Sequence, residues 1–370
     1  MAAYTTIDNP ELFFQCKTFS GNASTQALTF DNTDTSMQPD LVWLKQRNAT
    51  AHHHLVDSVR GVGRYLFSNL SNAEGGDGFS DDGNDLLISF DSNGFTIDAG
   101  EDANASGATG VAWCWKAGTS FSNDASSTSV GTLDSTGSSS QTAGFSIVSY
   151  TSNGSSNQSV AHNLGAVPHM IISKNRDSSS SSYNYWTVYH HKNATANDKK
   201  LKLDTNDAVS GTNEWGDTDP TSTVYSLHTS GDGTTNVSTD KMISYVFTGI
   251  QGFSKFGTYV GNNTADGPFI YTGFQPAFIM VKSTSTGGSA TYSWSIFDTK
   301  RSSYNIQRAQ LEANTSDAED TGETADIDIL SNGFKPRYSP NDTNGNNTYI
   351  YMAFAEQPFV NSNGVPANAR

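Results

Sequence analysis

The chain repeats one order of residues: a proline in a turn, a short apolar run and then a lysine. This order occurs at residues 39–45, 168–174 and 276–282, and in each copy the proline stands six residues before the lysine. A short apolar run bounded by turn residues is typical of a buried strand, whereas the apolar positions of a surface helix recur every three or four residues. The shared spacing predicts one structural unit that is used three times, with the lysine marking where the chain leaves the core.

Further motifs recur in the same order in the first and last parts of the chain. Asp57-Ser-Val-Arg60 matches Asp298-Thr-Lys-Arg301, and Ser92-Asn-Gly-Phe95 matches Ser331-Asn-Gly-Phe334. Asn-Gly is a favoured hairpin turn because both residues tolerate a positive φ, so residues 86–97 predict two strands joined by such a turn. Several motifs in one order with near-constant gaps indicate an internal repeat.

The repeat suggests how the chain divides. We expect a lead-in and a first unit at 1–117, a second unit at 144–251, and a third unit with a C-terminal tail at 252–370. Residues 118–143 are almost wholly Ser, Thr, Gly, Asn and Asp. Such a segment buries too little apolar surface to order itself, so we expect a linker or an extended strap.

The predicted fold class is all-β. Each unit shows roughly six to eight short strand patterns over about 100 residues, which favours tandem antiparallel β-sandwiches, jelly-roll-like, over shorter propeller blades. No stretch keeps a 3.6-residue apolar period, and the best helical candidate, at 306–313, is short. We therefore predict three related sandwich repeats.

Composition narrows the classes of partner. The chain holds 21 Lys and Arg against 37 Asp and Glu, a net charge of −16. Such an acidic surface repels nucleic acid backbones and anionic lipids. No run approaches the roughly 18–20 apolar residues of a membrane span. No N-terminal signal peptide is recognisable either, so we expect a soluble protein made in the cytosol. Cys16 and Cys114 fit neither a disulfide framework nor a metal motif; we expect buried apolar roles, and a bond between them stays open.

Three constellations could carry chemistry. Alternate histidines of the His52–His54 triplet would share one strand face, as in metal sites, but no carboxylate–histidine pattern accompanies them. The Asp-x-x-Arg pairs noted above could be catalytic, yet an arginine fork that pins a loop is the favoured interpretation, since His190 replaces the aspartate in the second unit. Acidic loops at 80–85 and 317–320 offer calcium ligands but lack the twelve-residue calcium-loop spacing, which favours solvated loops.

Other catalytic signatures are missing from the sequence. It has no strained nucleophile elbow, phosphate-binding loop, dinucleotide fingerprint or zinc spacing. Nothing selects a carboxylate pair for sugar hydrolysis. The loop aromatics Tyr183, Tyr185 and Trp215 could stack on a sugar or anchor a protein, although half-buried packing is favoured. We expect no catalytic residue, cofactor or metal site, and no enzyme; the ligand-binding residues are unknown.

Long motifs carry a family resemblance. The opening Met1–Pro10, the strand Gln38–Lys45, the Asp57–Gly61 motif, Ser92–Phe95 and the closing Thr348–Val360 resemble a family of virion structural or tail-fibre-like proteins from tailed phages of marine bacteria. The resemblance spans nearly the whole chain. It implies a virion component, and it transfers no catalytic residue and no molecular role.

Three functions follow as hypotheses. The first is a tail-associated fibre, spike or accessory protein of a bacteriophage that attaches to the host surface; the second is a capsid decoration or head-fibre protein. The third is a depolymerase of surface glycans. Expected partners are other tail or capsid proteins and a host glycan or receptor. A homo-oligomer is also expected, with a trimer as the leading guess because virion positions are symmetric. The expected location is the virion, after synthesis in the host cytoplasm.

Overall fold

The structure is a computed structural model, and it is built almost entirely of antiparallel strands. It describes residues 4–31, 35–75, 87–99, 102–177, 184–211, 213–229, 235–285, 292–323, 325–339 and 342–366. Helix within these ranges is limited to η1 (Pro10–Leu12), η2 (Asp102–Asn104) and α1 (Ala125–Thr128). None of these described helices is long and apolar enough to cross a bilayer. The predicted all-β class, with several antiparallel sheets, is confirmed.

Three large sheets, which we name arrays, share one order of strands. Array one consists of β1 (Phe14–Ser20), β8 (Thr109–Trp115), β3 (Leu41–Gln46), β4 (His54–Asp57) and β5 (Leu66–Phe67). Array two consists of β11 (Phe145–Thr151), β17 (Lys241–Phe247), β13 (Met170–Asn175), β14 (Thr187–His190) and β15 (Leu201–Lys202), with β10 (Ser135–Ser140) and β9 (Thr119–Asn123) added beside β11. Array three consists of β18 (Ser254–Val260), β25 (Thr348–Pro358), β20 (Phe274–Ser283), β21 (Ser295–Asp298) and β22 (Leu311–Glu312). In each, the first strand pairs with the last strand of the unit, and that strand pairs with the proline-to-lysine strand.

A smaller sheet accompanies each array. These sheets are β2 (Gln26–Thr29), β7 (Gly94–Ile97) and β6 (Leu87–Asp91) for array one, β12 (Gln158–Ala161) and β16 (Val224–Leu227) for array two, and β19 (Ile270–Tyr271), β24 (Gly333–Pro336) and β23 (Ile327–Leu330) for array three. Apolar side chains fill the space between sheet and array, as where Phe95 and Leu28 pack with Val42 and Ala112. This face-to-face packing is the arrangement of a β-sandwich.

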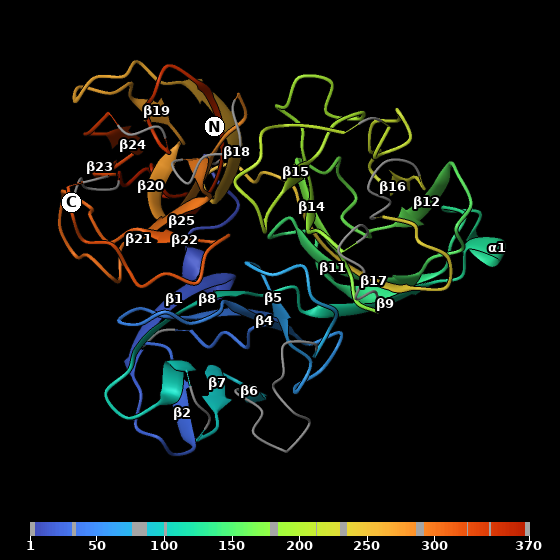
Figure 1. The fold of residues 1–370 in the computed structure, drawn as a ribbon, viewed down its shortest axis with the longest axis horizontal. Helices are drawn as coiled ribbons and strands as arrows, with labels where there is room; N and C mark the ends of the chain where they lie inside the picture. Colours follow the sequence, from blue (N-terminus) through green and yellow to red (C-terminus); the bar gives the residue numbers. More distant parts are fainter. Residues whose placement is uncertain are drawn as a thin grey trace.

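The inner faces of the three arrays meet around one core (Figure 1). At its centre lie Trp115 of array one, Phe247 of array two and Phe354 of array three. Their ring centroids are 6.5 Å, 5.6 Å and 6.0 Å apart, so each ring contacts the other two. Aromatic rings at these separations contribute beyond the apolar area that they bury. The arrays therefore form a closed ring, a relation that strand patterns alone did not predict.

The proline-to-lysine segments are buried strands, as predicted, but their lysines do not leave the core. Segments 39–45, 168–174 and 276–282 become β3, β13 and β20, each with a paired strand of its array on both sides. All three lysines that end the motif are 0% exposed. A buried ammonium is stable only where carbonyl or carboxylate oxygens replace its water shell, and the junctions below supply them.

Residues 118–143 differ from the sequence prediction, and the best helical candidate is not a helix. Residues 118–143 are not a linker, because β9 and β10 pair in register and extend array two beside β11. An existing sheet edge supplies backbone partners, so a Ser/Thr-rich segment needs no core of its own. Residues 306–313 are extended rather than helical, since Gln307 bridges to Ile327 and Leu311 pairs with Ile296. Tertiary pairing here overrides a weak helical pattern.

The hairpin predicted at 86–97 is present as β6–β7, and Gly94 has the predicted positive φ, +132°. Gly94 is the first residue of β7 rather than a turn residue. A Cβ on Gly94 would lie 2.2 Å from the carbonyl oxygen of Leu28 in β2, and one on Gly333 would lie 2.1 Å from that of Ile270 in β19. The glycine is therefore required by the close approach of a third strand.

Candidate functional site

A buried lysine crosses each junction between arrays. We name the junctions 1–2, 1–3 and 2–3 after the arrays that meet. The bonds run from Nζ of Lys174 to the Ser71 carbonyl at 3.1 Å, from Nζ of Lys45 to that of Ser316 at 3.3 Å, and from Nζ of Lys282 to that of Asn206 at 3.4 Å. Burial lowers the pKa of Lys282 to about 8, with Asp342 and Asp207 opposing this effect. Each lysine thus holds a loop of the neighbouring array.

A second bond of common design crosses two of these junctions, 1–2 and 2–3. Nε1 of Trp186 donates to the carbonyl of Phe67 in β5, and Nε1 of Trp294 donates to that of Lys202 in β15, both at 2.8 Å. Each tryptophan directly precedes the fourth strand of its array. His53 stands at the equivalent position before β4. In the last two units the tryptophan stands twelve residues after the lysine that ends the motif, and these bonds explain why it recurs there.

The 1–3 junction carries a layer of buried charge. Arg301 pairs with Asp298 and Glu319. Glu319 also receives two bonds from Arg47 of array one, at 2.9 and 2.7 Å, and Trp113 donates to Asp298 at 3.0 Å. Burial would lower the pKa of Arg301, but the two carboxylates raise it above its ordinary value. The arginine is therefore held as a cation between two anions.

The 1–2 junction repeats this layer with equivalent residues. Arg60 pairs with Asp57 and with Glu74, the latter at 3.2 Å. Glu74 also pairs with Arg176 of array two at 2.7 Å. Tyr245 donates to Asp57 at 2.9 Å, where Trp113 does so in the other layer. Both charged layers thus consist of a forked arginine, two carboxylates and a second arginine from the neighbouring array.

The 2–3 junction has neutral residues at all of these positions. His190 replaces the aspartate, and its Nε2 lies 3.3 Å from the carbonyl oxygen of Tyr351. Asn193 stands where the forked arginine would be and is 6% exposed, and its amide atoms have no hydrogen-bond partner among the described residues. At the charged junctions the backbone N–H of Glu319 or Glu74 also donates to the carbonyl of the second arginine. At the 2–3 junction Val209 and Thr284 occupy these two positions, and the N–H of Val209 donates to the carbonyl of Thr284 at 3.3 Å.

The enclosure of the Asp-x-x-Arg pairs bears on their role. The side chains of both aspartates and both arginines have no exposed surface. A general acid or base must reach its substrate directly or through one water molecule, and these groups are saturated by neighbours within the core. The geometry therefore fits the structural interpretation favoured from the sequence.

Two members of the histidine triplet, His53 and His54, are buried in the core, and His52 is partly exposed. Nδ1 of His53 accepts a bond from Trp43 at 2.9 Å, and its ring stacks on Trp113. The ring of His54 lies 4.9 Å from that of Phe67. Burial lowers the pKa of His54 to about 3 and that of His53 well below the ordinary value, so both are neutral at pH 7. Within the described ranges, no three His, Cys, Asp or Glu side chains are placed to hold a metal.

Only one of the two acidic loops lies within the described residues. The loop at 80–85 lies outside the described residues. In the loop at 317–320, Glu319 is engaged by Arg47 and Arg301. A carboxylate that already pairs with two arginines is a poor ligand for calcium, so this loop serves the 1–3 junction instead.

The remaining candidates from the sequence are mostly buried. Tyr183 lies outside the described residues, and Trp215 is 1% exposed. A lysine ammonium lies 3.6 Å from the ring centroid of Tyr185, a cation–π contact. Cys16 and Cys114 are free and buried. They belong to different clusters on opposite faces of array one, so they cannot form the bond left open above.

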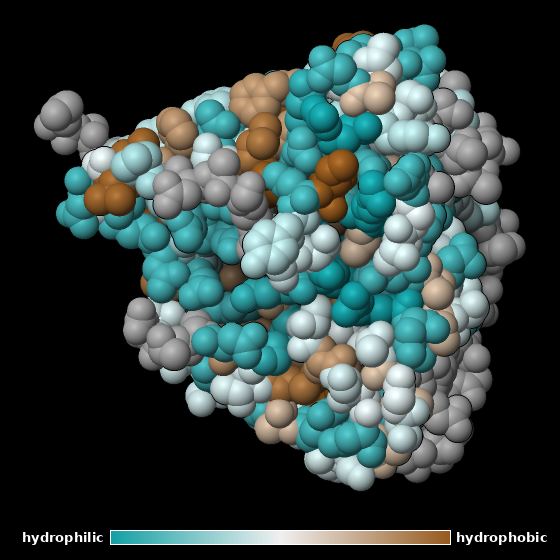
Figure 2. All heavy atoms as spheres, turned by 90° about the vertical axis from the view of Figure 1, so that its left-hand side faces the viewer, coloured by the Kyte–Doolittle hydropathy of each residue, from teal (hydrophilic) through white to brown (hydrophobic). Residues whose placement is uncertain are grey.

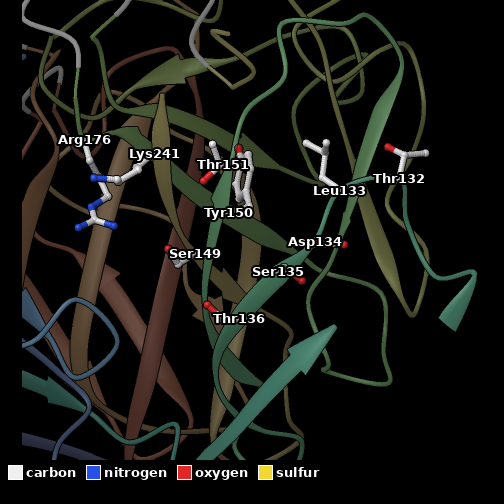
Figure 3. A pocket seen from close by; sticks show the side chains of 10 residues that line it. All are labelled: Thr132, Leu133, Asp134, Ser135, Thr136, Ser149, Tyr150, Thr151, Arg176 and Lys241. Atoms are coloured by element: carbon white, nitrogen blue, oxygen red, sulfur yellow. The ribbon is translucent and has the colours of Figure 1, made fainter. Parts of the chain in front are cut away.

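Two pockets were not foreseen from the sequence. The first, which we call the hydroxyl pocket, has a volume of about 530 Å³ and lies at the end of array two (Figure 3). Arg176 and Lys241 lie at one end of it, Thr132 and Leu133 at the other, and serine and threonine side chains between them. Arg176 is already paired with Glu74. Hydroxyl groups offer hydrogen bonds in this pocket, Leu133 and Tyr150 offer apolar contact, and one of its two cations is already committed to an ion pair.

The second, which we call the cationic pocket, has a volume of about 420 Å³ and lies where arrays two and three meet the N-terminal segment. Its lining residues are Tyr4, His169, His191, Lys192, Gly249, Gln251, Gly252, Ser254, Lys255, Phe256, Tyr271, Thr272 and Gly273. None of these described lining residues is acidic, although the chain carries a net charge of −16.

Bonds fix the walls of the cationic pocket. Nζ of Lys255 donates to the carbonyl of Tyr271 at 2.7 Å and lies 5.1 Å from the centroid of its ring. The hydroxyl of Tyr4 donates to the carbonyl of Gly273 at 2.8 Å. Tyr271 is nevertheless 46% exposed, so its ring remains available to a ligand. Sequence reasoning missed this pocket because its residues come from separate segments that only folding brings together.

The smaller sheet of array three forms an exposed face beside this pocket. Phe269 and Tyr271 point outward, at 49% and 46% exposure, on either side of the buried Ile270. Figure 2 shows the surface on this side of the molecule, where hydrophobic residues stand in separate patches among hydrophilic ones. Ion pairs of Lys335 and Arg337 with Asp266 border this face. Aromatic side chains within a polar border are typical of a contact surface.

Comparison with known proteins gives one result. Neither a curated protein nor a solved structure matches the chain. The model of the family described as a domain of unknown function (DUF7483) matches residues 9–358, and because that range is nearly all of the chain, the protein belongs to this family.

Proposed function

We propose that the protein is a structural component of a tailed-phage virion, associated with the tail, and that it contacts the host surface. The distribution of exposed apolar side chains carries the adhesive part of this proposal. Of nine large hydrophobic side chains that are exposed among the described residues, seven lie between Val260 and Val365, in or around array three. Such gathering on one part of an otherwise acidic protein favours an interaction surface there.

The buried junctions support the same role. Lysine, tryptophan and arginine bonds tie the three arrays into one closed body. A rigid body presents surface residues in fixed positions, which reduces the entropy lost on binding. The virion assignment itself rests on the sequence resemblance, and a non-enzymatic role remains part of the proposal.

Locating the protein in a reconstruction of the intact particle tests the proposal. We expect density for the closed three-array body on the tail, with array three directed outward. Density on the capsid would overturn the tail assignment. Absence from purified particles, checked by mass spectrometry, would overturn the virion role.

A capsid position is the second candidate, and one observation favours it. Three arrays of one strand order surround one core, so a single chain presents three similar faces. Such a body suits a site between three equivalent capsid subunits. Mass photometry adds a test of the expected trimer: a particle near the 39.6 kDa of one chain at micromolar concentration would contradict a preassembled trimeric spike.

A further inference from the structure

We propose that the cationic pocket binds an acidic sugar, a saccharide unit that carries a carboxylate. The inference rests on the proposed adhesive role and names the class of ligand. The pocket brings together two lysines, two histidines and an exposed tyrosine ring at the meeting point of arrays two and three. Its volume of about 420 Å³ falls within the roughly 300–1,000 Å³ typical of ligand sites.

Charge is the first argument. Lys192 and Lys255 line the pocket, and its described lining includes no carboxylate. Elsewhere in the described structure many surface cations are neutralised by carboxylates, as Lys335 is by Asp266 at 2.6 Å. Lys255 instead donates to a carbonyl and faces a ring. The lysines attract an anion to this pocket, whereas the acidic surface elsewhere on the protein repels anions.

The hydrogen-bonding state of His169 is the second argument. Its Nδ1 accepts the backbone N–H of Gly249 at 2.8 Å. Burial, together with His191 and Lys192, lowers the pKa of His169 to about 4, so the ring is neutral at pH 7. A neutral imidazole that accepts at Nδ1 carries its proton on Nε2. His169 lines the pocket and is half-buried, so we take its Nε2–H as the group that donates to a ligand.

Ring chemistry is the third argument and separates a sugar from a simple anion. Tyr271 exposes nearly half of its surface beside the lysines. Its hydroxyl lies 3.1 Å from that of Tyr4, which fixes the edge of the ring. A sugar offers C–H groups to such a ring and hydroxyls to Nε2–H of His169, while its carboxylate pairs with an ammonium. A small inorganic anion would use the lysines alone.

Two glycines are required in the wall of the pocket. Gly252 and Gly273 line it with φ of +79° and +88°. A Cβ on Gly273 would lie 2.8 Å from the hydroxyl of Tyr4, and one on Gly252 would lie 2.7 Å from Cβ of Thr5. Side chains at these positions would be strained, so glycine permits this backbone path.

Calorimetric titration of the full chain with tetragalacturonate tests the proposal, with a neutral galactose tetrasaccharide as the matched ligand. We expect binding of the acidic ligand alone, weakening as salt is raised. Lys192→Gln should weaken binding about tenfold, the effect of losing one charge-assisted bond. Lys192 is exposed, so this change should leave folding intact. Tyr271→Ala should weaken binding of tetragalacturonate but leave any binding of inorganic sulfate unchanged.

Lys241→Gln is the matched control, since Lys241 is an exposed lysine in the hydroxyl pocket of the same array. It should leave the affinity unchanged. Equal affinity for the neutral tetrasaccharide, no effect of Lys192→Gln, or an equal effect of Lys241→Gln would overturn the inference.

The proposed function can fail separately from this inference. If the chain binds host envelope polysaccharide but not tetragalacturonate, the acidic-sugar inference is wrong and adhesion stands. If it binds neither, the adhesive function is wrong as well. Chromatography of the titrated ligand should show intact tetrasaccharide, and shortened products would overturn the non-enzymatic role.

Discussion

The 1–3 and 2–3 junctions both join two arrays, but they differ in the groups that they bury. Both are crossed by a buried lysine that donates to a carbonyl of the neighbouring array. The 1–3 junction adds the charged layer around Arg301, whereas the 2–3 junction has His190 and Asn193 at the equivalent positions. Two arrays can therefore be joined with or without a layer of buried ion pairs, provided that backbone groups are paired.

The difference shows which bonds form the common frame. Lysine-to-carbonyl bonds occur at all three junctions, and tryptophan-to-carbonyl bonds occur at two. Among the described residues the charged layers occur at two junctions, so the third is held without one. Buried ion pairs often add little net stability, because desolvation offsets attraction, but they penalise wrong partners. We interpret the charged layers as selecting which arrays meet, a hypothesis that the following variants examine.

The largest expected effect is from Arg301→Met. The change leaves Asp298 and Glu319 buried without their shared cation. Removing one partner of a buried pair costs about 3–5 kcal/mol, so the free energy of unfolding should fall by that amount in urea denaturation. A loss below about 1 kcal/mol would show that the layer is not tightly coupled. Arg60→Met at the 1–2 junction should lower the free energy of unfolding by a similar amount.

Converting the charged layer to its neutral counterpart should cost less than the single change. The quadruple variant Arg47→Thr, Asp298→His, Arg301→Asn and Glu319→Val copies the residues of the 2–3 junction. It leaves no unpaired charge, so it should be about 2 kcal/mol more stable than Arg301→Met in the same assay. If the quadruple variant is the less stable one, the two chemistries are not interchangeable.

The neutral junction should be sensitive to acid. Burial first, and then His191, His169 and Lys192, lower the pKa of His190 to about 3, against the Tyr351 carbonyl. The unfolded chain binds a proton at this histidine below about pH 6.5 and the folded chain does not. Stability therefore falls as the pH is lowered through that window, by about 2 kcal/mol at pH 5.

His190→Asn removes this contribution. The loss in free energy of unfolding between pH 7 and pH 5 should be smaller in the variant than in the parent by about 2 kcal/mol. Equal losses in the two proteins would show that His190 is protonated within the folded state, and the neutral description of this junction would be wrong.

The smallest effects are expected for Trp186→Phe and Trp294→Phe. Each removes the indole hydrogen bond to a carbonyl of the neighbouring array, that of Phe67 or of Lys202. The cost should be about 1 kcal/mol and similar for both, because the same bond serves a charged and a neutral junction. A clear difference between the thermal midpoints of the two variants would show that the charged layer at the 1–2 junction changes the contribution of the tryptophan bond.

The sequence by itself determined the strands and their repetition. Apolar runs between turns located β3, β13 and β20, since short-range patterning reports which residues are buried. It also set the acidic charge and the Asp-x-x-Arg pairs. It could not indicate that 118–143 would join a sheet, because the partner edge at β11 is supplied by another segment.

The tertiary structure alone decided where the lysines point and where the pockets lie. Lys45 looks from sequence like a residue leaving the core, yet its acceptor at Ser316 lies 271 residues away. The cationic pocket combines Tyr4, His169 and Tyr271, which no local pattern connects. Local sequence fixes periodicity and burial, but long-range pairing of donors and charges depends on which arrays meet, and only the closed ring settles that.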